Sequence, residues 1–463
     1  MNEMLRQYVA KLEDLAGHSG LDYYNVDFEE VPDTFMTEIA VYGFPVRMPH
    51  WSFGLRYIYQ LVQHRMGHSR LFEVVFPGNP NRAYLANRNT LEENTLVSAH
   101  VLGHADFAKN NLLFKRSQEQ VGSRIVEQAA AHARRIAEAV DKYGAATVEA
   151  VMDAALALEQ HIDITKNLTR PLYPEYEPDE PAVVPDAFRE RFNRLEEETP
   201  VSTDPPHRRR SKIPPAPERD LLWFIARYAP ELDDWERDIF LAVREESFYF
   251  YPVFACQIMN EGWACYWHAR LLREADFLPQ QVYLDAIKAH SDVVRPFAGE
   301  DQVAFALNPY HVGFEMWEYI IDSSGLDTAR KIMKEDDDFS FIRNYLDEDL
   351  AAKLGMFEFM AKKNGEISVT EDGIDAIRER ILAPKFNFGA PTIFATSIEV
   401  DGTLQLTHDY QRDDRGLDLM RAEKVLGYIE RGWRRPVRIN TIDAEGNEKV
   451  VTIGSAKEAG VTA

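Results

Sequence analysis

The sequence predicts a mainly α protein, of the α+β type, with short N-terminal strands and a small α+β module at its C-terminal end. Stretches rich in Ala, Glu and Leu have the spacing of amphipathic helices, chiefly over residues 90–164, 220–290 and 311–354. β-branched residues alternate with polar ones in short runs before residue 90 and after residue 390. The 463 residues suffice for two or three domains of ordinary size.

The first predicted segment, residues 1–170, holds short strands followed by helices. The clearest strand signal is 71–76, closed by the turn Pro77-Gly78-Asn79-Pro80, and a second short strand is expected at 83–87. Aromatic residues at helical spacing predict a helix over 51–66. Further helices are expected over 91–113, 118–143 and 145–164.

Residues 171–218 are predicted to form a proline-rich connecting arm. Of the 24 prolines in the chain, 11 lie between Pro171 and Pro217, which excludes a packed helix or a central strand. A second part of the helical core is expected over 219–383. Residues 384–463 form the predicted C-terminal module, with strands at 392–399, 403–408 and within 437–453, and a helix at 419–431.

The charge and the composition exclude several classes of protein. With 52 Lys and Arg against 76 Asp and Glu, the net charge of −24 argues against a general nucleic-acid binder. Two cysteines, Cys256 and Cys265, cannot make a disulfide framework. The sequence has neither a secretory leader nor a run of about 20 apolar residues, so we expect a cytoplasmic protein without a membrane span.

Several common catalytic motifs are missing. The chain lacks the glycine-rich nucleotide-binding motifs and the Gly-x-Ser-x-Gly elbow of serine hydrolases. None of the 13 histidines is followed by Glu, so the His-Glu-x-x-His motif of zinc proteases is absent. None has Glu three residues before it, which removes the Glu-x-x-His signature of di-iron bundles.

The first candidate site is the pair His100 and His104. Two histidines at i and i+4 share one face of a helix, so both imidazoles can reach one metal ion. Glu93, seven residues before His100, falls on nearly the same face. A structural pair of histidines has the same spacing, so the spacing alone leaves both interpretations open.

Three later segments also combine His or Glu with Gly, Asn and aromatic residues. Glu261 and His268 share one helix face within 259–268, His311 opens a helix after an Asn-Pro-Tyr turn, and Glu246 lies in an aromatic helix end at 244–252. Each alone has an ordinary explanation, as a capping carboxylate, a core residue or a solvated pair. Together they are typical of a site assembled from several helices.

These segments resemble the SpoVR family, named for a stage V sporulation protein. The resemblance runs in order from about residue 23 to residue 450. The motifs that carry it are His50-Trp-Ser-Phe-Gly54, His100-Val-Leu-Gly-His-Ala-Asp-Phe-Ala-Lys-Asn-Asn111, Leu222-Trp-Phe-Ile-Ala-Arg-Tyr-Ala-Pro230, Met259-Asn-Glu-Gly-Trp-Ala264 with His268, Asn308-Pro-Tyr-His-Val-Gly-Phe314 and Asn387-Phe-Gly-Ala-Pro391.

The SpoVR resemblance implies a cytoplasmic protein linked to sporulation and formation of the spore cortex, although members also occur in organisms that do not sporulate. It also implies partnership with a serine protein kinase and a von Willebrand A-type protein. It implies no settled biochemical activity.

A second, shorter resemblance is to gluzincin-type metallopeptidases, in which two helix histidines and a glutamate from a later helix hold Zn²⁺. It implies a zincin-like helical core, with His100, His104 and Glu261 as metal ligands. The chain departs from that pattern at Val101, where the peptidases have the glutamate that activates water. Another carboxylate must then serve as the base, or the site binds metal without peptidase chemistry.

Three functions follow from these patterns. The leading hypothesis is a metal-dependent hydrolase of amide or peptide bonds. His100, His104 and Glu261 would hold a divalent metal, for which Zn²⁺ is the first candidate. Its predicted catalytic residues are Glu246 or Asp106 as the base and His268 or His311 as an oxyanion-stabilising group or further ligand.

The second hypothesis is a non-catalytic scaffold or regulatory partner of the kinase system, in which the same polar residues specify helix packing. The third is a di-metal oxidase, which the missing Glu-x-x-His pair disfavours; its ligands would be Glu93, His100, His104, Glu261, His268 and His311.

The acidic residues concentrate outside these motifs, in runs such as 335–338 and 347–349. Arg56, Lys109 and Arg244 lie near the motifs in sequence. We therefore expect a locally neutral or positive cleft that takes a peptide-like or anionic small-molecule substrate. A homo-oligomer is a further expectation.

Overall fold

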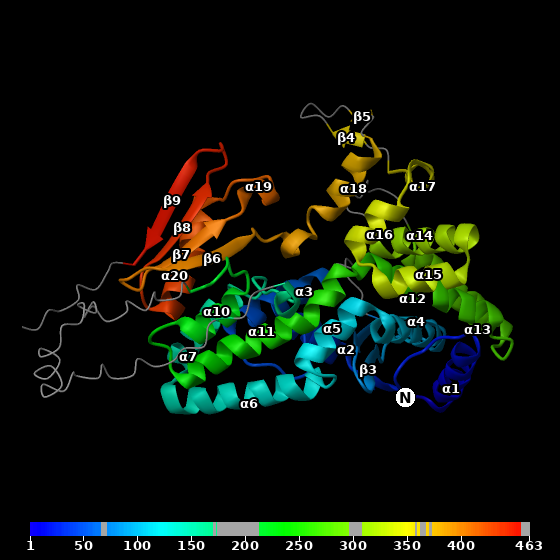
Figure 1. The fold of residues 1–463 in the computed structure, drawn as a ribbon. Helices are drawn as coiled ribbons and strands as arrows, with labels where there is room; N and C mark the ends of the chain where they lie inside the picture. Colours follow the sequence, from blue (N-terminus) through cyan, green and yellow to red (C-terminus); the bar gives the residue numbers. More distant parts are fainter. Residues whose placement is uncertain are drawn as a thin grey trace, which may run out of the picture.

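Helices dominate the chain, and its strands form small sheets (Figure 1). The computed structural model describes residues 1–65, 72–169, 173, 213–295, 308–356, 359–361, 367–369 and 373–454. The predicted mainly α fold of the α+β type is confirmed.

The elements of the first part are α1 (Glu3–His18), β1 (Val26–Val31), α2 (Asp33–Tyr42), α3 (Trp51–Arg65), β2 (Glu73–Phe76), β3 (Asn81–Ala86), α4 (Leu91–Asn110), α5 (Leu112–Val121), α6 (Ile125–Tyr143), α7 (Ala145–Leu156) and α8 (Lys166–Thr169). The helix expected over 91–113 ends earlier because Asn111, in an extended conformation, caps α5 with its side chain. The helix expected over 118–143 is divided at Gly122, whose φ of 83° ends α5.

The elements of the second part are α10 (Leu221–Tyr228), α11 (Asp234–Ala255), α12 (Gln257–Glu274), α13 (Gln280–Val293), α14 (Pro309–Ser324), α15 (Leu326–Glu335), α16 (Asp338–Tyr345), α17 (Glu348–Lys353), β4 (Phe359–Ala361), β5 (Ile367–Val369), α18 (Ile374–Leu382), the 3₁₀ helix Phe386–Gly389, β6 (Ile393–Ile398), β7 (Leu404–His408), α19 (Tyr410–Asp413), α20 (Leu419–Trp433), β8 (Val437–Ile442) and β9 (Glu448–Ile453).

A three-stranded sheet near the N-terminus has the order β1-β3-β2. β3 pairs in parallel with β1 and antiparallel with β2, so β2 is an edge strand whose Glu73 lies opposite Leu85. Side chains alternate between the two faces of a strand. Val75 packs against one apolar core and Val74 against another, so Glu73 shares the face of Val75.

α4 is the central helix of the first core. All its residues from Asn94 to Ala108 are buried, which is the pattern of a helix surrounded by other elements. Thr90 and Glu93 form a capping box that fixes where the helix begins. α4 packs against α1, α12 and α13.

Glycines let α4, α12 and α14 approach one another closely. A Cβ atom on Gly262 of α12 would lie 2.2 Å from the carbonyl carbon of Gly313 in α14, and one on Gly103 of α4 would lie 2.6 Å from Cα of Ala264. No heavier residue fits at such distances without a shift of the helices. The side chains next to these glycines are therefore brought together at the crossing.

Two apolar cores stabilise the chain, and each takes residues from before residue 170 and after residue 219. The sheet β6-β7-β8-β9 and α20 pack on the second core with α10 and α11. Parallel β7 and β8 are joined through α20, as a crossover requires. Figure 1 shows this sheet at one end of the molecule and α13 at the other.

The strands and the helix expected between residues 392 and 453 appear as β6 to β9 and α20. The predicted arm over 171–218 lies outside the described residues, apart from Tyr173 and residues 213–218. Within the described residues, no helix is both long and apolar enough to cross a membrane.

Candidate metal centre

His100 and His104 of α4 meet Glu261 of α12 in the first core. Glu261 Oε2 lies 3.4 Å from Nε2 of His100 and 3.4 Å from Nε2 of His104. The ligand atoms of all three residues lie within 4.8 Å of one another. The sequence prediction that these three side chains lie together is therefore met by the geometry.

The helix ends explain why the three side chains converge. One turn of α4 separates the two histidines, so both rings leave the same face. α12 begins where the Asp338 carboxylate accepts hydrogen bonds from the backbone N–H groups of Ile258 and Met259, each 2.9 Å long. These groups have no partner within the helix, and the contact fixes the start of α12.

The other ring nitrogen of each histidine has its own partner. His104 Nδ1 lies 2.9 Å from Asn260 Oδ1, and His100 Nδ1 lies 2.9 Å from His268 Nδ1. His268 Nε2 in turn lies 2.6 Å from His290 Nδ1. Such partners orient metal-ligating histidines and leave Nε2 as the ligand atom.

The charges of the group favour an ionised carboxylate. Burial alone raises the pKa of Glu261, but the charge of His104 and the contacts with both imidazoles outweigh it and hold the pKa well below its usual range. Burial, and then the neighbouring His104, lowers the pKa of His100. The charge of Glu261 and the contacts with Glu261 and Asn260 outweigh burial and raise the pKa of His104, so a metal ion that binds there would displace a proton from His104.

Two buried atoms at the centre have no hydrogen-bond partner. They are Nε2 of His100 and Oε2 of Glu261. The two atoms lie 3.4 Å from each other as an ion pair without a hydrogen bond, and a metal ion between them would satisfy both. Ligands about 2.0–2.1 Å from a tetrahedral Zn²⁺ lie about 3.4 Å apart, which matches the distances from Glu261 Oε2 to the two Nε2 atoms.

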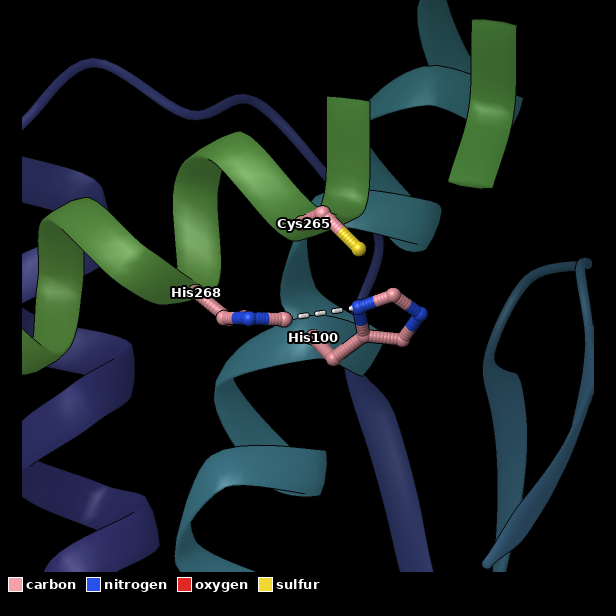
Figure 2. A group of neighbouring side chains, drawn as sticks. All are labelled: His100, Cys265 and His268. Carbon is pink, nitrogen blue, oxygen red and sulfur yellow. Dashed lines mark hydrogen bonds between the residues drawn. The ribbon is translucent and has the colours of Figure 1, made fainter. Parts of the chain in front are cut away.

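A second group shares His100. Figure 2 shows Cys265 and His268 of α12 on the Nδ1 side of the His100 ring, and the three ligand atoms lie within 4.8 Å of one another. A metal there would need the thiolate, but burial raises the pKa of Cys265 well above its usual value. The hydrogen bond between the two histidines also occupies both Nδ1 atoms. The group with Glu261 is therefore the better metal site.

Glu73 enters the centre from the edge strand β2. Its Oε1 lies 4.0 Å from His100 Nε2. Burial, followed by the negative charge of Glu261, raises the pKa of Glu73 to about 7. A carboxyl group with this pKa can both accept and release a proton near neutral pH.

Tyr310, in the first turn of α14, closes another side of the centre. Its ring lies 6.1 Å from that of His100, in a stacked orientation. The charge of Glu261, followed by burial, raises the pKa of Tyr310 well above its usual value. The phenol is therefore neutral and can donate a hydrogen bond.

A pocket of about 300 Å³ opens beside His100. Its described lining residues come from β2, α4, α12, α13 and α14 and from the positions flanking them: Phe72, Glu73, Glu93, Leu96, Val97, His100, His268, Ala289, Val293, Asn308 and Tyr310. A pocket of this size and mixed lining is typical of small-molecule sites.

Two of the predicted catalytic residues lie apart from this pocket. Asp106 accepts hydrogen bonds from Trp263 Nε1, 2.9 Å, and from the backbone of Asp22, 2.8 Å, and thereby ties α4 to α12 and to the loop after α1. His311 is half-buried on α14 and is not among the described residues that line the pocket. His268, in contrast, lines the pocket and contacts His100.

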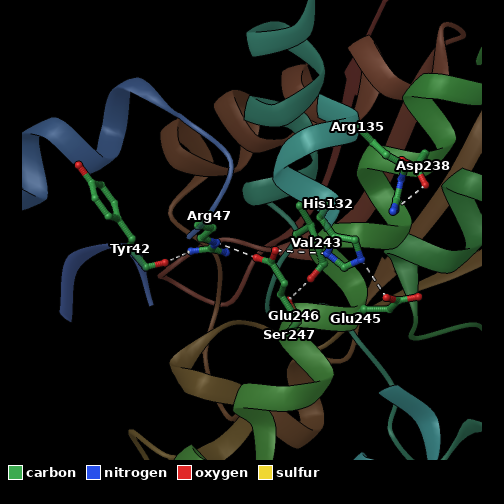
Figure 3. Close-up of polar contacts among 9 residues, drawn as sticks. All are labelled: Tyr42, Arg47, His132, Arg135, Asp238, Val243, Glu245, Glu246 and Ser247. Atoms are coloured by element: carbon green, nitrogen blue, oxygen red, sulfur yellow. Dashed lines mark hydrogen bonds and ion pairs between the residues drawn. The ribbon is translucent and has the colours of Figure 1, made fainter. Parts of the chain in front are cut away.

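The third, Glu246 of α11, belongs to a separate buried network (Figure 3). Its Oε2 accepts a hydrogen bond of 2.7 Å from Arg47 Nε, and its Oε1 lies 3.5 Å from Nδ1 of His132 in α6. Arg47 also donates to the backbone oxygen of Tyr42. Glu246 thus fixes the loop before α3 against α6 and α11.

His132 makes this network sensitive to pH. Burial alone lowers its pKa, but Glu245, 3.1 Å away, and Glu246 outweigh it and raise the pKa to about 9. The charged imidazole therefore stabilises the fold fully below pH 6.5, the ordinary histidine pKa, and this contribution is lost as the pH rises through about 9.

We expect the variant His132→Gln to be less stable than the parent at pH 6.5, with the difference shrinking by pH 9.5. Urea midpoints at several pH values measure this difference. The exposed His18 of α1 gives the control His18→Gln, for which no such trend is expected. A difference that stays constant between pH 6.5 and 9.5 would show that the charge of His132 is not involved.

Sequence reasoning missed Glu73, Tyr310 and Asn260 as members of the centre. Glu73 carried one signal, as the charged residue in the apolar run 71–76. Tyr310 and Asn260 stand inside the motifs that carry the SpoVR resemblance. The motif that begins at His50 lies elsewhere, where His50 and Trp51 both bind Asp153 of α7.

Comparison with known proteins gives consistent results. Residues 1–389 match the family described as "SpoVR like protein". The chain is 28% identical over 488 aligned positions to the "Uncharacterized protein YcgB" of Escherichia coli (strain K12), an alignment that covers 96% of this chain and 93% of that protein. No solved structure matches the chain. The family match extends over the centre and most of the helical part, and the chain belongs to the SpoVR family.

Proposed function

We propose that the chain is a metal-dependent hydrolase of amide or peptide bonds, with a divalent metal held by His100, His104 and Glu261. The observation that carries the proposal is the convergence of three ligand atoms, two of them buried without a hydrogen bond, beside an open pocket. Two nitrogens and one carboxylate oxygen suit Zn²⁺ and leave a fourth position for water or substrate.

A metal bound there supplies Lewis acidity and a water whose pKa is near 7. Glu73, 4.0 Å from His100 Nε2, is placed to take the proton of an attacking water and pass it to the leaving amine. Tyr310, a neutral phenol beside Glu261, is placed to donate a hydrogen bond to the oxygen that becomes negative during attack.

The proposed role of Glu73 as the base compensates for Val101, which stands where the gluzincins have the glutamate that activates water. Val101 is fully buried in the first core, so this position of α4 cannot supply a base. Glu73 supplies a carboxylate from the edge strand β2 instead, with its face set by the alternation of the strand. The base is therefore proposed to come from a strand, not from the helix of the two histidines.

The polar shell around the ligands supports the proposal. Asn260 and His268 hold the Nδ1 atoms of the two histidines, as partners of metal ligands usually do. Nε2 of His100 and Oε2 of Glu261 lie 3.4 Å apart without a hydrogen bond, at the point where the metal is proposed to bind. The scaffold alternative, as a partner of a serine protein kinase and a von Willebrand A-type protein, is therefore second. Membership in the SpoVR family adds to the proposal a role in sporulation or in formation of the spore cortex, with substrates from the cell wall.

Metal analysis of the purified full chain tests the proposal. We expect about one equivalent of a divalent metal in the parent protein, and loss of it in His100→Ala, His104→Ala and Glu261→Gln. His18→Ala, in the exposed last turn of α1, is the matched control and keeps the metal. Less than about 0.2 equivalents after reconstitution, unchanged in His100→Ala, would overturn the metal site and leave the scaffold alternative.

A further inference from the structure

We infer that the pocket beside His100 takes an aliphatic side chain, carried by the residue whose carbonyl meets the metal centre. The position of the carbonyl rests on the proposed function, whereas the preference for an uncharged, apolar side chain rests on the pocket alone. The inferred substrate class is therefore an amide whose acyl part carries a side chain of about the size of leucine.

Two helices give the pocket apolar walls. Leu96 and Val97 of α4 stand one turn before His100, on the side of the helix that carries this histidine. Ala289 and Val293 of α13, which packs against α4, are also one turn apart and line the pocket. All four apolar residues belong to the first core or pack against it. An aliphatic group placed against them extends this core and removes apolar surface from water.

The described polar lining residues outside the metal centre are engaged within the protein. Oδ1 of Asn308 accepts a hydrogen bond of 3.1 Å from the backbone N–H of Tyr310. Nδ2 of the same amide donates to the backbone oxygens of Val293 and Arg295, at 3.0 and 2.8 Å. His268 contacts two other histidines through its two ring nitrogens. A polar side chain that entered the pocket would lose its water without gaining these groups as partners.

The charge of the pocket differs from the expected neutral or positive cleft. Its described lining residues include the carboxylates Glu73 and Glu93 and neither Lys nor Arg. The cations near the motifs are occupied elsewhere: Lys109 lies 2.5 Å from Asp22, and Arg244 pairs with the aspartate that caps α10. An anionic side chain therefore meets like charge in this pocket.

The two carboxylates have roles other than binding a cationic side chain. Oε2 of Glu93 accepts a hydrogen bond of 2.8 Å from the backbone N–H of Thr90 in the capping box of α4. Glu73 lies 4.0 Å from Nε2 of His100 and is the proposed base. With both carboxylates engaged, a neutral side chain fits the pocket best.

The volume of about 300 Å³ limits the size of the side chain. This value is at the lower end of the range for small-molecule sites. Ala289 is the smallest of the described apolar lining residues, so the pocket has room where this position of α13 carries only a methyl group. A larger residue at this position would take the space of the ligand.

Calorimetric titration of the full chain with the Nα-acetyl amides of leucine, asparagine and lysine tests the inference. Leucine and asparagine have similar shapes and differ in polarity, and lysine adds a positive charge. We expect the leucine ligand to bind with a Kd about 10-fold or more below those of the other two ligands. Equal binding of the three ligands, or tighter binding of the asparagine or lysine ligand, would overturn the inference.

Two substitutions that change the size of the pocket test its location. Ala289→Leu fills the pocket and is expected to weaken binding of the leucine ligand by about 10-fold or more. Ser291→Leu is the matched control, because Ser291 is exposed on the same helix and is not among the described lining residues. Val293→Ala enlarges the pocket and is expected to shift the preference from leucine toward the larger phenylalanine ligand.

Urea midpoints of the variants show which of them keep the fold, and the enlarged pocket decides the outcome if Ala289→Leu does not fold. Equal effects of Ala289→Leu and Ser291→Leu on leucine binding would place the ligand elsewhere and overturn the inference. An unchanged preference in Val293→Ala would do the same.

Hydrolysis of the matching anilides by metal-loaded protein separates the two proposals. Cleavage without preference for the leucine anilide leaves the hydrolase proposal intact and contradicts the inference. Absence of metal, together with a preference for the leucine ligand in titration, contradicts the hydrolase proposal and supports the apolar pocket.

Discussion

Replacing Glu73 by glutamine is expected to lower the rate of amide hydrolysis by roughly 10²–10⁴-fold while the bound metal stays in place. Glutamine has nearly the same shape but cannot take a proton from water, and Glu73 is not among the three proposed ligands. The measurement combines kcat/KM on a peptide anilide with the metal content of the same sample.

Glu29→Gln in β1 is the matched control, because Glu29 lies in the same sheet as Glu73 and is not among the described residues of the pocket. It is expected to keep both the rate and the metal. An unchanged rate in Glu73→Gln would assign the base to another residue. Loss of metal together with the rate would make Glu73 a ligand.

Gly262→Ala is expected to destabilise the fold by about 1–3 kcal/mol and to disrupt the metal centre. The added methyl group would lie 2.2 Å from the backbone carbonyl carbon of Gly313, where only a separation of α12 and α14 makes room. Because Glu261 precedes this glycine, the shift also moves the carboxylate away from His100. Urea unfolding and metal affinity measure the two effects.

Gly427→Ala in α20 is the control, because a Cβ atom there would meet nothing within 4 Å. Alanine within a helix is favoured over glycine, so this variant is expected to be more stable by about 0.5–1 kcal/mol. If Gly262→Ala were equally stabilising, the close crossing of α12 and α14 would be disproved.

Much of the fold was accessible from local patterns. The helix expected at 419–431 ends two residues later, as α20, and the strand expected at 403–408 begins one residue later, as β7. In these segments periodicity and turn residues agree with the tertiary packing. The proximity of His100, His104 and Glu261 was predicted from the i, i+4 spacing of the two histidines and from the resemblance to gluzincins.

Local sequence patterns could not predict the base or the charge of the pocket. Glu73 reaches His100 because β2 pairs with β3 beside α4, a contact that no local pattern encodes. Glu246 stood in an aromatic segment that looked functional, but its partner Arg47 is 199 residues away in the chain. Closeness in sequence also gave a wrong location for the positive charge of Lys109, because this side chain pairs with Asp22 in a distant loop.

The centre draws on β2, α4, α12 and α14, from Glu73 to Tyr310, so it is complete only when some 240 residues have folded around α4. Contacts of such long sequence separation form slowly, because the chain loses much entropy before they are made. A ligand that binds there binds the native chain alone and stabilises it by about 2.7 kcal/mol at a hundred times its Kd. Occupancy of the centre therefore reports on the folding of the whole helical part, and its loss is an early sign of partial unfolding.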